Sequence, residues 1–290
     1  MKIVNIIGGI GNQMFQYALA LTFCFDHPED KILIDISHYN HYKLHTGFEL
    51  KRVFNVNLPV AQKSDIACLS YYIPHYTLSR IVRKILPKRK TEYIERAPYH
   101  YDDALGKLAG DMYFEGYWQS PKYFDRYRRQ ITEAFKFPEF DNLENRETAR
   151  AIGQQETVSI HVRRGDYVGT TDYSGICTVE YYRKAIEWVF ATWKAPVFFI
   201  FSDDMDWCKS NIIPLLRGRQ VFLVDCNRGK DSYRDMQLMS MANCCVIANS
   251  SFSWWGAWLN ARPEKVVIAP SKWVNSTDAK DIYPSDWILV

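Results

Sequence analysis

The sequence predicts an α/β protein made of two Rossmann-like halves that face a central cleft. In the second half, apolar runs of strand length alternate with stretches of helix length, as in a parallel, doubly wound sheet. The first half opens in the same way, with a strand, a glycine turn and a helix. Polar residues follow several of the apolar runs directly, and open α/β sheets bind ligands outside the carboxyl ends of their strands.

Composition and charge fit a globular protein of this size. The 290 residues are 47% hydrophobic and 24% charged, and they suffice for one large α/β unit or two domains. The formal net charge of +3 gives no argument for nucleic acid, so we expect no nucleic-acid partner. The seven cysteines are odd in number and lack zinc-like spacing, which indicates reduced thiols. With a strand at the start, no secretory leader and no bilayer-length apolar run, we expect a cytoplasmic protein.

The first element is a strand at residues 2–7, and a glycine-rich turn joins it to a helix expected from Met14 to Phe25. Gly9 and Gly11 allow a ligand to approach the backbone, and the helix N-terminus offers free N–H groups. A dinucleotide fingerprint would need a third glycine, where Gln13 stands. A plain packing turn is the alternative, but the amides of Asn12 and Gln13 favour contact with a bound donor.

The first half also carries candidate residues for a sugar acceptor. Asp35 lies near the carboxyl end of the second strand, at 31–36, and the stretch 113–124 is rich in aromatic residues. This stretch is either a buried strand and turn or an exposed platform on which a sugar ring stacks. We expect an acceptor site made of residues from both segments: Asp35, Glu115, Trp118 and Gln119.

Two further segments bear on possible membrane contact and on the domain boundary. Residues 80–90 carry six basic residues interleaved with Ile, Val and Leu. A solvated helix face is the plainer interpretation, and peripheral contact with the inner face of the plasma membrane is the alternative. The polar run at 139–156 reads as a helix and linker, which places a domain boundary near residue 152 and gives domains of 1–152 and 153–290.

The second half contains the most informative motif, a strand that ends in Arg163-Arg164-Gly165-Asp166. We expect five strands here, at 157–162, 197–202, 221–225, 244–248 and 265–269. Arginine forks match the oxygens of phosphate or carboxylate, and Asp166 is near enough to orient one guanidinium. A structural Arg–Asp pair that closes a surface turn is the alternative.

Two other strand ends carry polar groups. The strand at 197–202 runs into Asp203 and Asp204, which we expect to accept hydrogen bonds from a base or ribose. Asp204-Met205-Asp206 has the Asp-x-Asp spacing of a metal site, but Asp206 reads as a helix-start residue, so we favour no metal.

The strand at 244–248 leads into Asn249-Ser250-Ser251-Phe252-Ser253, which has more hydroxyls than a helix cap needs and suggests an oxyanion site. Arginines, the glycine turn and this serine turn would together surround a diphosphate. Fixed positive charge there stabilises a departing phosphate selectively in the transition state.

Four motifs, in order along nearly the whole chain, make the sequence similar to the inverting α1,2-fucosyltransferases. Three are specific, and the short Ser-Asp-Asp is not. Ile10 stands where the family more often has Leu. The absence of the membrane anchor of the animal enzymes suggests a bacterial member. The motifs are Gly8-Gly9-Ile10-Gly11-Asn12-Gln13-Met14-Phe15-Gln16-Tyr17, His161-Val162-Arg163-Arg164-Gly165-Asp166-Tyr167, Phe201-Ser202-Asp203-Asp204 and Ser250-Ser251-Phe252-Ser253-Trp254-Trp255-Gly256-Ala257-Trp258-Leu259.

The resemblance implies a GT-B fold, GDP-β-L-fucose as donor, and transfer to the 2-hydroxyl of a terminal galactose with inversion and without metal or cofactor. The acceptor would be a galactose-terminated oligosaccharide or a lipid-linked glycan. By similarity, Arg163 binds the β-phosphate and assists departure of GDP, while Asn12 reaches the diphosphate. His161, Asp204 and the Ser250-Ser251-Phe252 turn would hold the nucleotide.

The resemblance leaves the general base open among Asp166, Asp35 and Glu115, and a weak base with a dissociative route is also compatible with it. Arg163, Arg164 and Asp166 are the expected catalytic residues. Three alternatives remain: fucosyl transfer to another sugar hydroxyl, a nucleotide-dependent oxidoreductase, and a non-catalytic sugar-binding module.

Overall fold

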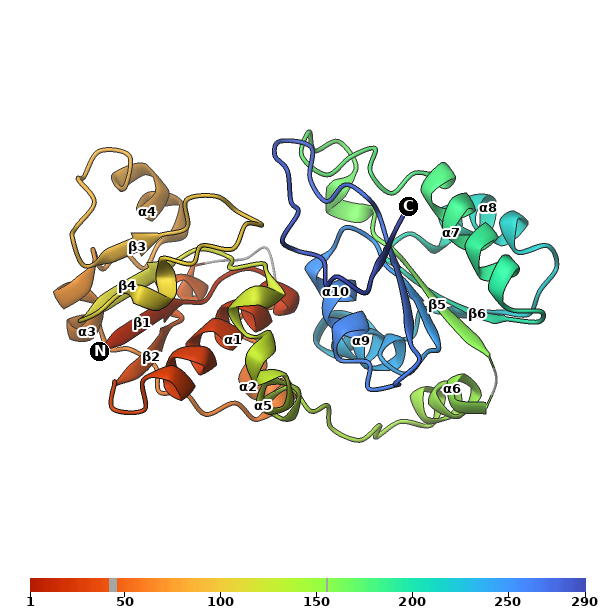
Figure 1. The fold of residues 1–290 in the computed structure, drawn as a ribbon, viewed down its shortest axis with the longest axis horizontal. Coiled ribbons are helices and arrows are strands. Elements are labelled where there is room, and N and C mark those ends of the chain that lie inside the picture. Colours follow the sequence, from red (N-terminus) through yellow and green to blue (C-terminus); the bar gives the residue numbers. More distant parts are fainter. Residues whose placement is uncertain (42–45, 155) are drawn as a thin grey trace. The chain divides into compact units, whose positions relative to one another are not determined.

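The computed structural model describes residues 1–41, 46–154 and 156–290, and it divides into two compact units (Figure 1). Unit 1 comprises Met1–Phe137 with Lys280–Tyr283, and unit 2 comprises Pro138–Ala279 with Pro284–Val290. The division falls before residue 152 because helix α6 (Leu143–Gln154) belongs to unit 2. The side chain of Asn145 on α6 is fully buried and exchanges hydrogen bonds of 2.7 and 2.8 Å with Asn227.

Unit 1 is built on a parallel sheet in the order β2-β1-β4-β3. Its strands are β1 (Lys2–Asn5), β2 (Ile32–Asp35), β3 (Glu92–Ile94) and β4 (Met112–Glu115). Its α-helices are α1 (Ile10–Asp26), α2 (Leu50–Phe54), α3 (Lys63–Leu69), α4 (Tyr76–Val82) and α5 (Arg128–Ala134). Short 3-10 turns lie at Ser37–Asn40, Leu105–Lys107, Pro121–Tyr123 and Asp125–Tyr127.

Helix α1 begins at Ile10, four residues before the expected start at Met14. The turn between β1 and α1 is completed by Gly8, whose φ of 91° lies in the left-handed region that glycine tolerates. Gly11 and Gln13 are buried in the first turns of the helix, and Asn12 lies there half-buried. The expected loop at 8–13 is therefore shorter than its glycines suggested, because burial against the sheet outweighs the low helix propensity of glycine.

Unit 2 is built on a second parallel sheet, in the order β10-β9-β8-β5-β6-β7. The five expected strands are confirmed, and the two-residue β10 was too short for a sequence pattern to reveal. The strands are β5 (Thr157–Val162), β6 (Val197–Ser202), β7 (Val221–Val224), β8 (Cys244–Val246), β9 (Val266–Ala269) and β10 (Ile288–Leu289). The remaining α-helices are α7 (Val179–Thr192), α8 (Met205–Asn211), α9 (Tyr233–Met239) and α10 (Ser251–Trp258). Three 3-10 turns lie at Gly165–Tyr167, Ile213–Leu216 and Gly229–Asp231.

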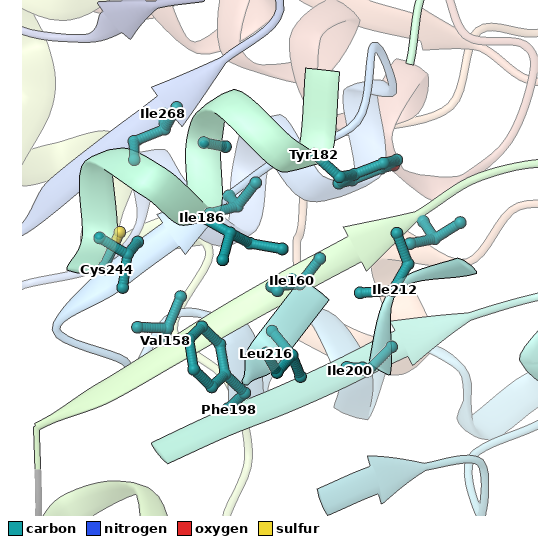
Figure 2. Packing of buried hydrophobic residues seen from close by; sticks show 14 of the residues in the cluster. Val158, Ile160, Tyr182, Ile186, Phe198, Ile200, Ile212, Leu216, Cys244 and Ile268 are labelled. Atoms are coloured by element: carbon teal, nitrogen blue, oxygen red, sulfur yellow. The ribbon is translucent and has the colours of Figure 1, made fainter. Parts of the chain in front are cut away.

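The core of unit 2 explains why β5 ends where it does. Val158 and Ile160 are fully buried, as is Phe198 on β6, and Figure 2 shows them beneath Tyr182 and Ile186 of α7. Every residue of β5 is buried, as expected for a central parallel strand covered on both faces. The buried run stops at Val162, so the arginines that follow lie at the edge of the sheet.

Two further findings concern the described residues as a whole. Among them, no helix combines the length and the apolar character that a bilayer crossing would require. All seven cysteines fall in the described part of the chain, and all are free thiols.

Candidate active site

The sheet of unit 2 brings three of the expected motifs to one edge. The chain builds outward from β5 through β6 to β7, and then returns to the other side of β5 with β8, β9 and β10. The carboxyl ends of β8, β5 and β6 are therefore neighbours, and the change of direction between β5 and β8 is the position where open α/β sheets bind ligands. Arg163, Asp203 and Ser250 follow these three strands.

Two carboxylates fix the fork of Arg163. One terminal nitrogen lies 2.7 Å from Asp166 Oδ1 and the other lies 3.0 Å from Asp203 Oδ2. The guanidinium carbon lies 5.6 Å from the ring centroid of Tyr167 and within reach of cation–π attraction. The side chain still keeps 32% of its exposure. Arg163 is thus an oriented cation open to solvent, and Asp166 orients it.

Asp203 holds the whole Arg-Arg-Gly loop. Its carboxylate accepts hydrogen bonds from the backbone N–H groups of Arg164 at 2.9 Å and Gly165 at 3.1 Å, besides pairing with Arg163. A Cβ at Gly165 would lie 2.8 Å from Asp203 Oδ2, so only glycine allows this approach without a shift. In this geometry Asp203 is a positioning residue for Arg163, and its direct contact with a base or ribose stays a prediction.

Arg164 is held differently, by Asp204 and by Trp207. Its Nε lies 3.0 Å from Asp204 Oδ2, and its guanidinium carbon lies 4.3 Å from the ring centroid of Trp207. Asp204 also accepts from the Trp207 N–H at 3.0 Å and so caps α8, a role expected for Asp206. Sequence reasoning missed Trp207, because nothing local relates a tryptophan on α8 to an arginine after β5.

The Asp-x-Asp pair does not converge on a metal site. Asp204 is engaged with Arg164, whereas Asp206 is almost fully exposed and pairs with Lys209 at 3.0 Å. Across the ranges that the structure describes, no group of three or more His, Cys, Asp or Glu side chains is placed to hold a metal ion.

His161 is the last residue but one of β5 and is a buried, neutral imidazole. Burial, together with the positive charge of Arg163, lowers its pKa to about 4, and the charge of Asp203 opposes that change. Its ring centroid lies 5.8 Å from that of Phe252 on α10. Among the described residues, its buried Nδ1 has no hydrogen-bond partner. Since buried polar atoms are nearly always paired, this nitrogen is available to a ligand donor or acceptor.

The serine turn before α10 is partly structural. Ser250 Oγ accepts from the Phe252 N–H at 3.4 Å and so caps the helix. Asn249 donates to the Trp273 carbonyl at 3.0 Å, and Ser253 donates to the Ala248 carbonyl at 3.4 Å. The surplus of polar groups expected to bind an oxyanion is therefore smaller than it appeared, and the role of the Ser250-Ser251-Phe252 turn toward an oxyanion stays a prediction.

A cavity of about 170 Å³ lies at the corresponding edge of the sheet of unit 1. The order β2-β1-β4-β3 places a change of direction between β1 and β4, and the cavity is lined from the ends of β1, β3 and β4 and from α4. Several polar side chains line it beside Ile7 and Ile94, among them Asn5, His38, Tyr76, Arg80, Glu95 and Glu115. This edge is thus a second candidate binding site, separate from that of unit 2.

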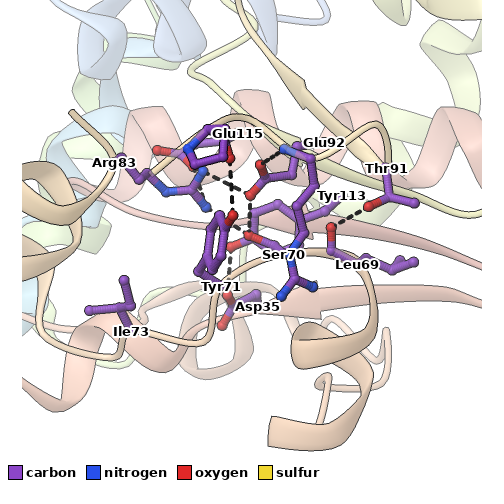
Figure 3. A network of polar contacts seen from close by, with 12 residues as sticks. Asp35, Leu69, Ser70, Tyr71, Ile73, Arg83, Thr91, Glu92, Tyr113 and Glu115 are labelled. Atoms are coloured by element: carbon purple, nitrogen blue, oxygen red, sulfur yellow. Dashed lines mark hydrogen bonds and ion pairs between the residues drawn. The ribbon is translucent and has the colours of Figure 1, made fainter. Parts of the chain in front are cut away.

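The two acidic acceptor candidates differ in this structure. Glu115 lines the cavity, and its Oε2 pairs with Arg83 at 2.9 Å (Figure 3). Burial raises the pKa of Glu115, and the charge of Arg83 opposes that rise. Asp35 is only 2% exposed and accepts from the Tyr113 hydroxyl at 2.7 Å and the Ser37 N–H at 2.8 Å. Asp35 is therefore a buried anchor outside the cavity lining, and its role toward an acceptor stays a prediction.

Trp118 lies in a buried turn, as in the first of the two alternatives for the stretch 113–124, and not on an exposed platform. Its ring is fully buried, with φ at 55°, and packs edge-on against Phe114 and Tyr123. Glu95 fixes this turn by accepting from the N–H groups of Tyr117 at 2.8 Å and Trp118 at 3.1 Å. Tyr117, 36% exposed, is the aromatic residue of the turn that lines the cavity.

The glycine-turn amides are mostly used within unit 1. Gln13 donates to the carbonyls of Gly8 and Gly47, each at 2.9 Å, and its Oε1 accepts from the Glu49 N–H at 2.9 Å. The amide of Gln13 is therefore occupied within unit 1, and its role toward a donor stays a prediction.

Asn12 accepts at 2.7 Å from Gln119, which is itself largely buried. Gly11 is enclosed in α1. Roles of Gly9 and Asn12 toward a diphosphate stay predictions.

Comparison with known proteins identifies the family. Residues 1–290 match glycosyl transferase family 11. The alpha-1,2-colitosyltransferase of Escherichia coli is 32% identical over 294 residues, which cover 99% of this chain and 98% of that protein. The O-antigen biosynthesis glycosyltransferase WbnK of E. coli is 28% identical, with 97% of each chain covered. The galactoside alpha-(1,2)-fucosyltransferase 2 of Gorilla gorilla gorilla is 29% identical over 64% of this chain and 58% of its own length.

Solved structures agree on the fold. The fucosyltransferase NodZ from Bradyrhizobium superposes with a TM-score of 0.52 at 15% identity, covering 88% of this chain and 90% of that chain. NodZ soaked with GDP-fucose gives 0.50 at 15% identity, with 89% and 91% covered. The α/β fold with parallel sheets is thus shared with a fucosyltransferase. The family match sets aside the alternatives of an oxidoreductase and a non-catalytic module. The chain belongs to glycosyl transferase family 11 and is a glycosyltransferase.

Proposed function

We propose that this glycosyltransferase moves L-fucose from GDP-β-L-fucose to the 2-hydroxyl of a terminal β-galactose, with inversion and without a metal. The observation that carries the proposal is Arg163, an oriented and solvent-open cation at the switch point of unit 2. In this reading unit 2 binds the donor and unit 1 the acceptor, as in the GT-B arrangement that the resemblance implies.

The donor side follows from the chemistry of the leaving group. As the bond between sugar C1 and the β-phosphate oxygen breaks, negative charge grows on GDP, and Arg163 stabilises that charge more in the transition state than in the ground state. Asp166 and Asp203 hold the fork in place before the donor arrives, so little reorganisation is needed. His161, Asp204, Ser251 and Phe252 would hold the nucleotide beside it.

The acceptor side follows from the cavity of unit 1. Its volume of about 170 Å³ suits one monosaccharide unit. The carboxylate of Glu115 would accept a hydrogen bond from a sugar hydroxyl, and the half-exposed ring of Tyr117 would cover an apolar sugar face. When the hydroxyl oxygen bonds to C1, its proton must leave, and a carboxylate with a raised pKa is suited to take it.

A second donor is favoured by one specific observation. The colitosyltransferase relative is 32% identical over 99% of this chain. Colitose is fucose without its 3-hydroxyl, so the two donors differ by a single polar group. A site that hydrogen-bonds the 3-hydroxyl rejects the deoxy analogue by about 10⁴-fold, whereas an apolar pocket discriminates by only about 10²-fold. Competition between GDP-fucose and GDP-colitose in one reaction decides which donor this chain prefers.

The test is GDP release from GDP-fucose, with and without lactose and with and without EDTA. The proposal expects release that requires lactose and survives EDTA. Loss of release in EDTA would overturn metal independence, and failure of the chain to bind GDP would overturn the donor assignment.

The matched variant is Arg163→Lys, which keeps the charge but loses the fork. We expect transfer to fall by at least about 10²-fold while the unfolding temperature stays near that of wild type. Arg183→Lys, at a half-exposed position on α7 that pairs with Glu180, is the control and should keep full activity. Near-normal turnover in Arg163→Lys would contradict the phosphate role.

A further inference from the structure

One segment of unit 1 concentrates the positive charge of the chain. Residues 66–91 contain six Lys and Arg residues and no Asp or Glu. The whole chain has 36 basic and 33 acidic residues, so without this segment 30 basic residues would face 33 acidic ones. The net charge would change from +3 to −3. The segment is therefore a local cationic region on an otherwise slightly acidic protein.

The same segment exposes large apolar side chains. Leu78 and Ile81 on α4 are 50% and 53% exposed, and Ile85 and Leu86 in the following turn are 77% and 38% exposed. The spacing of Leu78, Ile81 and Ile85 places them on one side of a helical turn. Lys84, Lys88 and Lys90 are exposed among them. We call these seven side chains the α4 patch.

Other basic residues fix the segment to unit 1 and leave the α4 patch facing outward. Arg83 points inward, where its terminal nitrogens lie 3.0 Å from Glu92, 2.9 Å from Glu115 and 2.8 Å from Ser70 (Figure 3). Arg89 donates to the Ala67 carbonyl at 2.8 Å and lies over the ring of Tyr71. The apolar side chains are thus held outward by a buried ion-pair network.

We propose that the α4 patch docks on an anionic lipid surface. Apolar side chains surrounded by lysines match such a surface, because the apolar groups enter the acyl boundary while the ammonium groups contact lipid phosphates. A second copy of the chain is a poor occupant, since it would bring like charge against the three lysines. Binding through the α4 patch is peripheral.

Docking also bears on the acceptor, a step that rests on the proposed function. Arg80, on the same helix as Leu78 and Ile81, lines the cavity of unit 1 together with Tyr76. A docked α4 would therefore hold the cavity close to the lipid headgroups. This position favours an acceptor sugar carried on a lipid over a free oligosaccharide.

The test is co-sedimentation of the full chain with vesicles of phosphatidylcholine alone or with about 30% phosphatidylglycerol. We expect binding only to the anionic vesicles, and weaker binding at high salt. Replacing the lysines (Lys84→Gln, Lys88→Gln, Lys90→Gln) should weaken partitioning by about 100-fold, at about fivefold for each charge. Replacing the apolar residues (Leu78→Ser, Ile81→Ser, Ile85→Ser) should weaken it by at least about tenfold.

The control removes three exposed lysines of unit 2 (Lys184→Gln, Lys194→Gln, Lys230→Gln) and should bind vesicles as wild type does. Equal binding to neutral vesicles, no binding to anionic ones, or an equal loss in the control would overturn the docking proposal. All variants should keep wild-type transfer to soluble lactose. If vesicle binding behaves as expected while GDP-fucose is not used, docking stands and the proposed function fails.

Discussion

Replacement of Asp235 by Asn should stabilise the protein at neutral and alkaline pH. Asp235 lies on α9, where burial raises its pKa to about 7, with Asp225 adding to the rise and the hydrogen bond from Asn227 opposing it. That bond is 2.8 Å long, and Asn227 is held in turn by Asn145 on α6. The folded state therefore prefers the protonated acid, which the neutral Asn mimics.

The expected gain in the free energy of unfolding follows from the shift in the pKa of Asp235. A rise from 3.8 to about 7 is about 3 units, or at most ~4 kcal/mol at ~1.36 kcal/mol per unit. The side chain keeps some exposure to water, so we expect about 2 kcal/mol. Since the folded pKa is raised, the stability due to the protonated form is fully present below about pH 4 and is lost as the pH rises through about 7.

Thermal unfolding at pH 5 and pH 8 measures the effect. Asp235→Asn should raise the unfolding temperature by about 4–8 °C at pH 8 and by much less at pH 5. Asp286→Asn, at an exposed position in unit 2, should change neither value. An equal gain at both pH values, or a loss at pH 8, would refute the reasoning, because either result would mean that ionising Asp235 carries no penalty in the folded state.

Three further outcomes are expected. Gly165→Ala places a Cβ 2.8 Å from Asp203 Oδ2, so the Arg163 pair must shift, and transfer should drop by at least about tenfold in a steady-state assay with little change in unfolding temperature. An unchanged rate would mean that Asp203 does not position Arg163. Glu115→Gln should raise the KM for lactose or lower kcat, while the affinity for GDP, measured by calorimetry, stays the same; weaker GDP binding would remove Glu115 from the acceptor side. Trp118→Ala removes a fully buried ring and should destabilise the protein by about 3–5 kcal/mol in denaturant unfolding, and a loss below ~1 kcal/mol would contradict its place in the core.

The candidate site of unit 2 was predictable because the sequence patterns that indicate it are local. The run from Thr157 to Val162 is buried on both faces, and the charged residues after it can only lie at the sheet edge. Asp203 after β6 and Ser250 after β8 lie at the sheet edge for the same reason. Parallel order then brings these ends together, so the grouping in unit 2 follows from an alternating pattern and from the residues that interrupt it.

The candidate site of unit 1 was less predictable, because the exposure of a side chain depends on partners that are distant in the sequence. An aromatic platform and a buried turn have the same local sequence, and Trp118 is buried because Phe114 and Tyr123 enclose it. Nothing in the sequence predicted the role of Glu95, because the turn whose N–H groups it binds lies more than twenty residues away in the chain. The start of α1 was misplaced for a related reason, since tertiary packing holds Gly11 in the helix.

The tail of the chain has a consequence for recombining family members. Residues Lys280–Tyr283 belong to unit 1, where Asp281 pairs with Lys122 at 2.5 Å and accepts from the Tyr101 N–H at 2.9 Å. The chain then returns to unit 2, where β10 pairs with β9. A chimera that exchanges unit 1 between two family members therefore has to carry residues 1–137 and 280–283 from the same parent. A single crossover near the middle of the sequence would separate Asp281 from the lysine that it evolved with.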